Sequence, residues 1–266
     1  MLPQGCACYL INLDRSPDRL AAMSERLADA GIAFERVAAV DGMALTEQQF
    51  LEQTRENRYY KPLRRGEVGC QLSHLEVMRR FVSSRQRYAV ILEDDAILAD
   101  GFPGLLREAI QLREGSTDRR LAWDVLKLAK GRRRLIDLGP LGRDHRLVEY
   151  GPSVPITTAA AVWTHAAAER WVRAYPGTAR PIDCDLQHPW EHGLRILSMH
   201  PPPVSAGTES AMGTSDHATR NPWPKLRYEG HRLIRKWRYF GGTYGWRFMA
   251  PWLWRRELNY HPEMPK

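Results

Sequence analysis

The sequence lacks the features that mark several large classes of protein. Its four cysteines, in 266 residues, fit neither the spacing of a zinc ribbon nor a disulfide framework. No apolar run approaches the ~20 residues that a membrane-spanning helix needs. No basic segment followed by an apolar core begins the chain, so we expect no signal peptide. The glycines form neither a P-loop nor a dinucleotide-binding motif. A cytoplasmic protein with reduced thiols is therefore expected.

An excess of positive charge accompanies an ordinary apolar content. The chain has 39 Lys and Arg against 31 Asp and Glu, a net charge of +8, which favours anionic partners such as phosphates, nucleic acid or an anionic membrane. An apolar content of 43% is enough for a well-formed core. The length suits one sizeable domain, residues 1–222, followed by an appendage, residues 223–266.

Segments typical of strands and helices alternate along the chain, which indicates an α/β fold with a mostly parallel central sheet. A strand at 7–13, a helix that starts at Ser16-Pro17 and a strand at 34–40 predict a β-α-β unit. A polar helix at 44–60 and a tight glycine turn at 66–70 follow. Later strands are expected at 88–92, 124–128, 157–164 and 194–199, and later helices at 72–81, 104–114 and 166–174.

The strongest chemical signal is an apolar run that ends in three consecutive carboxylates, Glu93, Asp94 and Asp95. A strand buried on both faces is apolar throughout, and ligands of open α/β sheets bind beyond the carboxyl ends of the strands. Neighbouring acids repel one another unless a cation neutralises them, and oxygen ligands suit Mg²⁺ or Mn²⁺. The triplet predicts a metal site that holds a diphosphate. A solvated strand end or a helix cap is the alternative.

Polar residues after the first strand predict a nucleotide pocket. They are Asn12, Asp14, Arg15 and Arg19. The two arginines are four residues apart, and guanidinium groups suit phosphate. The amides at the start of the helix near Ser16 could add to them. In the alternative interpretation, Asp14 caps a turn and both arginines are solvated.

Four stretches together resemble family 25 of the glycosyltransferases, which builds bacterial lipopolysaccharide and lipooligosaccharide and is related to the collagen galactosyltransferases. They are YLINLDR with DRL (9–15, 18–20), GEVGC with SH (66–70, 73–74), ILEDD (91–95), and PID (181–183) after the 158–162 strand. The resemblance covers residues 5–215. It implies a GT-A type fold and an inverting transfer, commonly of galactose from UDP-galactose, onto a glycolipid or glycan acceptor.

The same resemblance implies roles for the acidic residues. Asp95 and Asp94 would hold Mn²⁺ or Mg²⁺, which neutralises the charge of the leaving UDP. Glu93 would support the metal or contact the ribose. A late histidine or carboxylate often completes the metal shell in such a site. The candidates for it are His217, Asp216 and His200.

The resemblance also suggests donor contacts and a catalytic base. Ser73 and His74 would bind hydroxyls or phosphate of the donor, although a helix cap and a surface histidine would give the same pattern. Inversion needs a base for the acceptor hydroxyl. Asp183 is the first candidate, with Asp185 and Glu191 as alternatives. On an extended segment Asp183 and Asp185 would point the same way. At least one of the two is expected only to fix the loop.

The segment 223–256 combines nine Lys or Arg, one acid and five of the nine tryptophans. Leu226, Leu233 and Ile234 follow helical spacing. A basic amphipathic helix is typical of contact with an anionic membrane, where Trp and Tyr favour the interface. We expect peripheral attachment to the inner face of the cytoplasmic membrane, beside a glycolipid acceptor. The alternative is that the tryptophans pack onto the domain.

Two other classes of function compete with a glycosyltransferase. A sugar nucleotidyltransferase also places metal-binding acids beside a nucleotide, but its usual glycine- and lysine-rich phosphate loop is missing. A non-catalytic membrane or nucleic-acid binding module with a degenerate site is the other alternative. The intact acidic triplet argues against it, and we expect no nucleic-acid partner.

Overall fold

A computed structural model of the chain describes residues 1–150, 154–207 and 221–260. Its strands are β1 (Cys6–Asn12), β2 (Glu35–Ala38), β3 (Tyr88–Glu93), β4 (Ala96–Leu98), β5 (Val125–Lys127), β6 (Leu135–Leu141), β7 (His145–Tyr150), β8 (Ala160–Thr164), β9 (Ile196–His200), β10 (Val204–Ala206) and β11 (Glu257–Asn259). Its helices are α1 (Pro17–Asp29), α2 (Glu47–Thr54), α3 (Arg65–Ser83), α4 (Phe102–Gly115), α5 (His165–Arg173), α6 (Ile182–Asp185), α7 (Pro189–His192), α8 (Trp223–Tyr244) and α9 (Trp246–Met249), with 3-10 turns η1 (Gly42–Ala44) and η2 (Ala250–Leu253).

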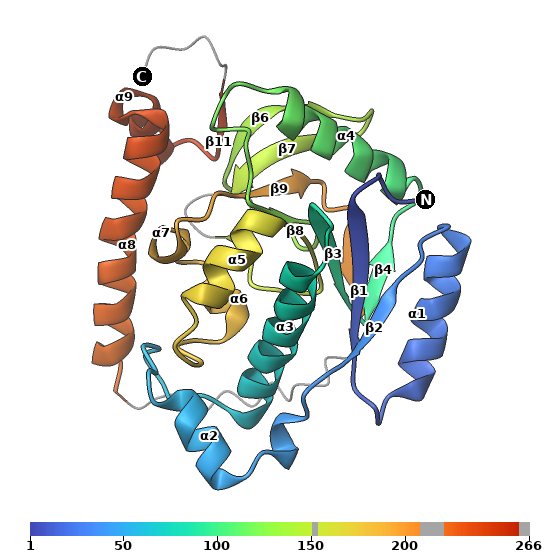
Figure 1. The fold of residues 1–266 in the computed structure, drawn as a ribbon. Coiled ribbons are helices and arrows are strands. Elements are labelled where there is room, and N and C mark those ends of the chain that lie inside the picture. The colour runs from blue at the N-terminus through green and yellow to red at the C-terminus, as the bar shows by residue number, and fades with distance from the viewer. Residues whose placement is uncertain (151–153, 208–220, 261–266) are drawn as a thin grey trace.

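A nine-stranded sheet in the order β11-β6-β7-β9-β5-β8-β3-β1-β2 forms the centre of the fold (Figure 1). Parallel pairs join β1 to β2 and β3, β5 to β9, and β6 to β11, while β7 and β8 run antiparallel to both neighbours. Seven of the nine strands therefore run in one direction. The predicted α/β class with a mostly parallel central sheet is confirmed, and so is the first β-α-β unit.

Strand β3 is apolar throughout because both of its faces are buried. Val90 and Leu92 pack into the core on the side of α1 and α4. Ala89 and Ile91 pack into the core on the side of α3 and α5. The chain turns polar only at Glu93, where β3 reaches the edge of the sheet. Since β1 and β3 are parallel neighbours, their carboxyl ends meet at this edge.

Two predicted local conformations are wrong. Residues 66–70 lie inside the first turns of α3. Gly69 is required there because a Cβ would lie 2.6 Å from the backbone of Val40 and Gly42. Residues 182–185 form the short helix α6 rather than an extended segment. A helix of this length is too short to produce an apolar period, so the pattern could not predict it.

The β6–β7 hairpin is an addition that the apolar pattern does not predict. Its strands carry buried acids, Asp137 and Glu149, and a register shift between Asp137 and Gly139. Both features interrupt the alternation by which a strand is normally identified.

The C-terminal segment packs onto the domain. Phe240, Tyr244, Trp252 and Leu258 are buried in the main core, and β11 extends the sheet beside β6. Figure 1 shows α8 along one side of the molecule, next to α7. Within the described residues, no helix is both long enough and apolar enough to span a bilayer. Many of the aromatic residues of this segment therefore serve the core.

Candidate functional site

The carboxylates that end β3 lie beside the end of β1, and each has different partners. Asn12, 1% exposed, donates from Nδ2 to Asp94 Oδ2 at 2.7 Å. Arg19 of α1 donates to Asp94 Oδ1 at 3.3 Å. Glu93 accepts a hydrogen bond from the Thr158 hydroxyl at 2.5 Å. These bonds fix two of the three carboxylates without using Asp95.

Asp95 is the acid whose charge is least compensated. Burial, with the charges of Glu93 and Asp94, raises its pKa to about 6, although Arg19 acts in the opposite direction. Its Oδ1 atom is buried and has no hydrogen-bond partner among the described residues. A divalent cation would supply that partner and relieve the repulsion between the acids. The oxygen ligands of Asp95 and Asp94 thus fit Mn²⁺ or Mg²⁺.

Glu93 belongs to a second group of possible ligands. Its Oε1 lies 3.2 Å from His74 Nε2, and one ligand atom each of Cys70, His74 and Glu93 lies within 4.8 Å of the others. Burial raises the pKa of the Cys70 thiol, which therefore stays protonated and binds metals poorly. Burial also opposes ionisation of Glu93, but the bonds with His74 and Thr158 lower its pKa overall. A hard cation would therefore fit the oxygen ligands at Asp95 better than this group.

Lys127 is a charged residue of the site that the sequence analysis misses. It lies in β5, is 1% exposed, and its ammonium donates to the carbonyl of Thr157. Burial lowers its pKa to about 8, while the negative charges of Asp183 and Glu93 oppose that shift. Lys127 thus places a positive charge near both acids. A lysine inside a buried apolar strand was the signal that could have identified it.

The predicted nucleotide residues separate into two groups. Asn12 and Arg19 contact the acidic triplet, as described above. Asp14 and Arg15 pair instead with other residues. Arg36 of β2 donates to Asp14 Oδ1 at 2.5 Å and also to Asn12 Oδ1 at 3.1 Å. Arg15 pairs with Asp41. Arg36, which the sequence analysis does not single out, is thus the residue that connects the end of β1 with β2.

Ser73 and the late histidines occupy other environments. The buried Ser73 hydroxyl accepts from the Val40 amide at 2.8 Å and donates to the Gly69 carbonyl at 2.7 Å, so it holds the end of β2 against α3. His200 Nδ1 lies 2.7 Å from the Tyr150 hydroxyl, at the β7–β9 pair. His217 and Asp216 lie outside the described residues.

The two candidate bases Asp183 and Asp185 both lie in α6 and have different environments. Asp185 is 6% exposed and is held by Arg180 Nη1 at 3.0 Å and His192 Nε2 at 2.8 Å. Arg180 also donates two hydrogen bonds to Glu191, at 2.9 and 3.1 Å. Asp185 and Glu191 are therefore both engaged in one ion-pair cluster. The predicted arrangement, in which Asp183 and Asp185 point the same way, is wrong because residues two apart on a helix diverge.

Asp183 has more freedom than Asp185. Its Oδ1 accepts from the amide of Cys184 at 2.7 Å, and its charge acts on Lys127 and Cys70. Cys70 is also subject to the charge of Glu93. The half-buried Asp183 thus acts on the same two residues, Lys127 and Cys70, as Glu93 does.

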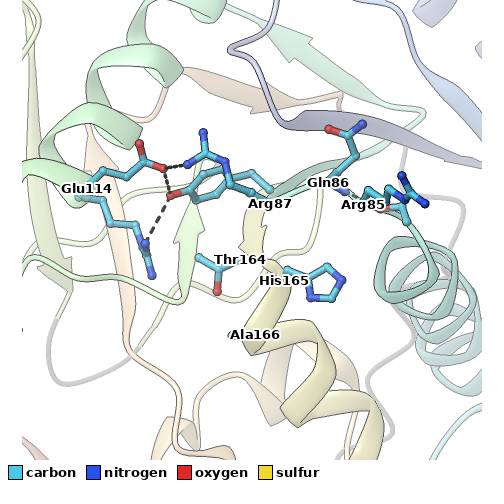
Figure 2. Close-up of a pocket in the computed structure, with 10 residues that line it drawn as sticks. Arg85, Gln86, Arg87, Glu114, Thr164, His165 and Ala166 are labelled. Carbon is cyan, nitrogen blue, oxygen red and sulfur yellow. Dashed lines mark hydrogen bonds and ion pairs between the residues drawn. The ribbon is translucent and has the colours of Figure 1, made fainter.

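A cavity of about 560 Å³ opens at the opposite end of β3, around Arg87 and His165 (Figure 2). Its acid, Glu114, pairs with Arg87 and accepts from the Tyr88 hydroxyl at 2.9 Å. Figure 2 shows this pairing across one wall. Since its carboxylate is already neutralised, this cavity lacks the uncompensated acids found at the carboxyl end of β3.

Known proteins resemble parts of this chain of different lengths. The family described as "Glycosyltransferase family 25 (LPS biosynthesis protein)" matches residues 6–128, which contain β1, α3 and the acidic triplet. Procollagen galactosyltransferase 2 of Mus musculus is 31% identical over 134 residues, 48% of this chain and 21% of that protein. A probable inactive glycosyltransferase 25 family member 3 of Bos taurus is 28% identical over 240 residues, 81% of this chain and 39% of that protein.

The chain therefore spans between a fifth and two fifths of the length of these relatives. Among solved structures, a glycosyltransferase involved in the glycosylation of the major capsid of PBCV-1 aligns with a TM-score of 0.35 and 12% identity, over 77% of this chain and 95% of that one. The resemblance to glycosyltransferase family 25 that the sequence motifs indicate is confirmed by the family match, which covers residues 6–128.

Proposed function

We propose that the protein is an inverting, metal-dependent glycosyltransferase. It would transfer galactose from UDP-galactose to a lipopolysaccharide or related glycan. The observation that carries the proposal is Asp95, a carboxylate beside two other acids with a buried oxygen that lacks a partner. Such a site is stable when a cation and a diphosphate complete it. The relatives named as galactosyltransferases support the choice of sugar.

Four residues would form the site for the metal and the donor diphosphate. Asp95 and Asp94 hold the divalent cation, which neutralises the charge of the leaving diphosphate when bound. Asn12 and Arg19 keep Asp94 in place. Since Arg19 is a partly exposed cation beside the acids, it can also approach a donor phosphate.

Asp183 is the proposed general base. It takes the proton of the acceptor hydroxyl as that oxygen attacks the anomeric carbon from the face opposite the leaving group. The buried ammonium of Lys127 interacts electrostatically with its carboxylate. Asp185 is excluded from this role in the proposal because Arg180 and His192 already occupy its oxygens.

The test measures thermal stability with UDP, in Mn²⁺ and in chelator. UDP at about 100 times its Kd should stabilise the protein by roughly 2.7 kcal/mol when metal is present. Asp95→Asn should abolish this gain, whereas Asp100→Asn, at an exposed acid before α4, should retain it. Since protons compete with the cation, the gain should shrink below the Asp95 pKa of about 6. Equal stabilisation by UDP in chelator would refute the role of Asp95.

A non-catalytic protein is the second candidate, because one relative that covers most of this chain is named as probably inactive. The two are separated by the release of UDP from UDP-galactose in the presence of a glycan acceptor. Metal-dependent binding of UDP without any turnover, over a range of acceptors, would favour the non-catalytic alternative. Release of pyrophosphate from UTP and galactose 1-phosphate, measured in a separate assay, would indicate a nucleotidyltransferase.

We also propose that the outer face of α8 contacts an anionic membrane surface. Leu226 and Ile234 are exposed there, at 58% and 57%, beside the exposed Arg238. Apolar side chains flanked by cations suit an anionic interface. Sedimentation with phosphatidylglycerol vesicles but not with phosphatidylcholine vesicles is expected. Equal recovery with both kinds would contradict the proposal.

A further inference from the structure

A second cavity, of about 710 Å³, lies between the first half of α8, residues 58–60 and the α6–α7 segment. We call it the α8 cavity. Five arginines line it against a single carboxylate, Glu191. The acidic triplet is not part of its wall. The α8 cavity therefore has the opposite charge from the metal site.

The positive charge of the α8 cavity is only partly neutralised. Arg180 is paired with Asp185 and Glu191, and Arg232 is paired with Glu229. Arg227 and Arg235 are exposed, and neither lies within ion-pair distance of a carboxylate in the described part of the chain. Two guanidinium groups are thus available to an anionic ligand, and their planar donors suit phosphate or carboxylate.

Aromatic side chains form the other part of the wall. The ring of Tyr228 packs against those of Tyr59 and Tyr60, with centroids 5.7 and 5.6 Å apart. The buried Tyr228 hydroxyl has no hydrogen-bond partner among the described residues. Aromatic faces pack on the C–H faces of sugars, and a buried hydroxyl without a partner is ready to bond a ligand hydroxyl. Together with the arginines, these groups favour a ligand that is both a saccharide and an acid.

The α8 cavity lies next to the proposed catalytic base. Arg180 lines it and precedes α6, the helix that carries Asp183. The next residue, Cys184, donates from Sγ to the Tyr59 hydroxyl at 3.6 Å. A ligand in the cavity and a donor at the acidic triplet would therefore lie on two sides of α6. Transfer needs the acceptor hydroxyl within about 3–3.5 Å of the anomeric carbon, so the rest of the acceptor would have to extend from the cavity past α6 to Asp183.

We propose that the α8 cavity binds the acidic part of a saccharide acceptor, with Arg227 and Arg235 holding its phosphate or carboxylate group. The inference rests on the proposed function and adds the chemical class of the acceptor. The donor diphosphate is assigned to the metal site, so the α8 cavity is left for the second substrate.

Isothermal titration calorimetry with monosaccharide probes, in UDP and Mn²⁺, tests the inference. Mannose 6-phosphate and galacturonic acid should bind, and uncharged mannose and galactose should bind about tenfold more weakly or not at all. The double variant Arg227→Glu and Arg235→Glu should weaken binding of both acids by about tenfold or more. Arg107→Glu, a charge reversal at an exposed position of α4, is the matched control and should leave binding unchanged.

Tyr228→Phe tests the saccharide part separately, because it removes one hydroxyl without changing the charge. It should weaken mannose 6-phosphate and leave inorganic phosphate unaffected. The inference would be overturned if acidic and neutral sugars bound equally well, or if phosphate bound as well as mannose 6-phosphate. It would also be overturned if the double variant bound both acids as tightly as the wild type. Displacement of mannose 6-phosphate by UDP in the absence of metal would also overturn the inference, because the α8 cavity would then be a nucleotide site.

The same samples separate this inference from the proposed function. Metal-dependent binding of UDP is measured before each titration, and the double variant should retain it. If UDP binds and acidic sugars do not, the inference fails alone. If acidic sugars bind and UDP does not, the proposed donor site fails instead, and with it the assignment of the cavity to an acceptor.

Discussion

The two aspartates of α6 allow structural and catalytic roles to be separated by the same chemical change. Asp185→Asn removes the charge of a carboxylate that is 6% exposed and lies 3.0 Å from Arg180 and 2.8 Å from His192. Asp183→Asn removes the charge of a half-buried carboxylate that accepts a hydrogen bond from a backbone amide. Both substitutions preserve side-chain volume, so any difference between them arises from charge.

The structure gives different magnitudes for the two changes. Removing one partner of a buried ion pair costs about 3–5 kcal/mol, because the other charge stays buried without compensation. Glu191 continues to compensate Arg180, so we expect the lower end, about 3 kcal/mol. A domain of this size loses roughly 2–4 °C of Tm per kcal/mol, which predicts a fall of about 10 °C for Asp185→Asn. Asp183→Asn should change stability by less than about 1 kcal/mol.

The catalytic effects should follow the opposite order. Loss of a general base lowers the rate by about 10²–10⁴-fold, which is expected for Asp183→Asn. Asp185→Asn, assayed at a temperature where it is fully folded, should retain most of the activity. Thermal unfolding by circular dichroism and release of UDP from UDP-galactose measure the two quantities on the same preparations.

The pH dependence of stability provides a check on the Asp185 argument. Burial favours its protonated form, but the interactions with His192 and Arg180 outweigh burial and lower its pKa. A carboxylate with a lowered pKa stabilises the fold above the unfolded value of about 3.9 and loses that effect as the pH falls through the folded value. The difference between wild type and Asp185→Asn should therefore narrow below about pH 4. A constant difference, or an Asp183→Asn variant that is as unstable as Asp185→Asn, would refute the reasoning.

Two further predictions concern residues that are fixed by their neighbours. Gly69→Ala should cost about 3 kcal/mol or more in denaturant unfolding, because the new Cβ would lie 2.6 Å from the backbone of Val40 and Gly42. Gly104→Ala, in α4 with nothing within 4 Å of the new Cβ, should stabilise the protein by up to about 1 kcal/mol, and a loss there would contradict the helix assignment. Burial lowers the pKa of Lys127 to about 8, so as the pH rises this residue loses its proton in the folded state before it does in the unfolded state. The wild type should therefore gain stability relative to Lys127→Met between about pH 8 and the unfolded-state pKa of about 10.4. That gain is about 3 kcal/mol at most, and a parallel pH dependence of the two proteins would show that Lys127 is not desolvated.

The position of the acidic triplet could be predicted because two strong local signals coincide there. Tyr88 to Leu92 are all buried, and only a strand with two covered faces requires such a run. Glu93 then marks the place where the strand reaches the edge of the sheet. Since most strands share one direction, the polar ends of β1 and β3 had to meet. The fold class and the position of the acidic triplet therefore follow from the same pattern.

The different environments of Asp183 and Asp185 could not be predicted because they depend on which side chains a short helix brings together. Pro181 and the two aspartates suggest a loop, and four helical residues give no periodic signal. Asp185 becomes structural only because Arg180 and His192 converge on it. The same limit applies to Lys127, whose role depends on the three-dimensional approach of Glu93 and Asp183.

The basic C-terminal segment illustrates why a charge pattern predicts a partner less well than it predicts a helix. The helix itself follows from spacing, and α8 covers Trp223–Tyr244. Its cations, however, have different environments: Lys236 is buried and burial lowers its pKa to about 7, and Arg232 is paired with Glu229. Only exposed cations such as Arg227 and Arg235 can act on a ligand at full charge. A net charge therefore identifies the sign of a partner, but the side chains that bind it are selected by the packing of α8 against the rest of the fold.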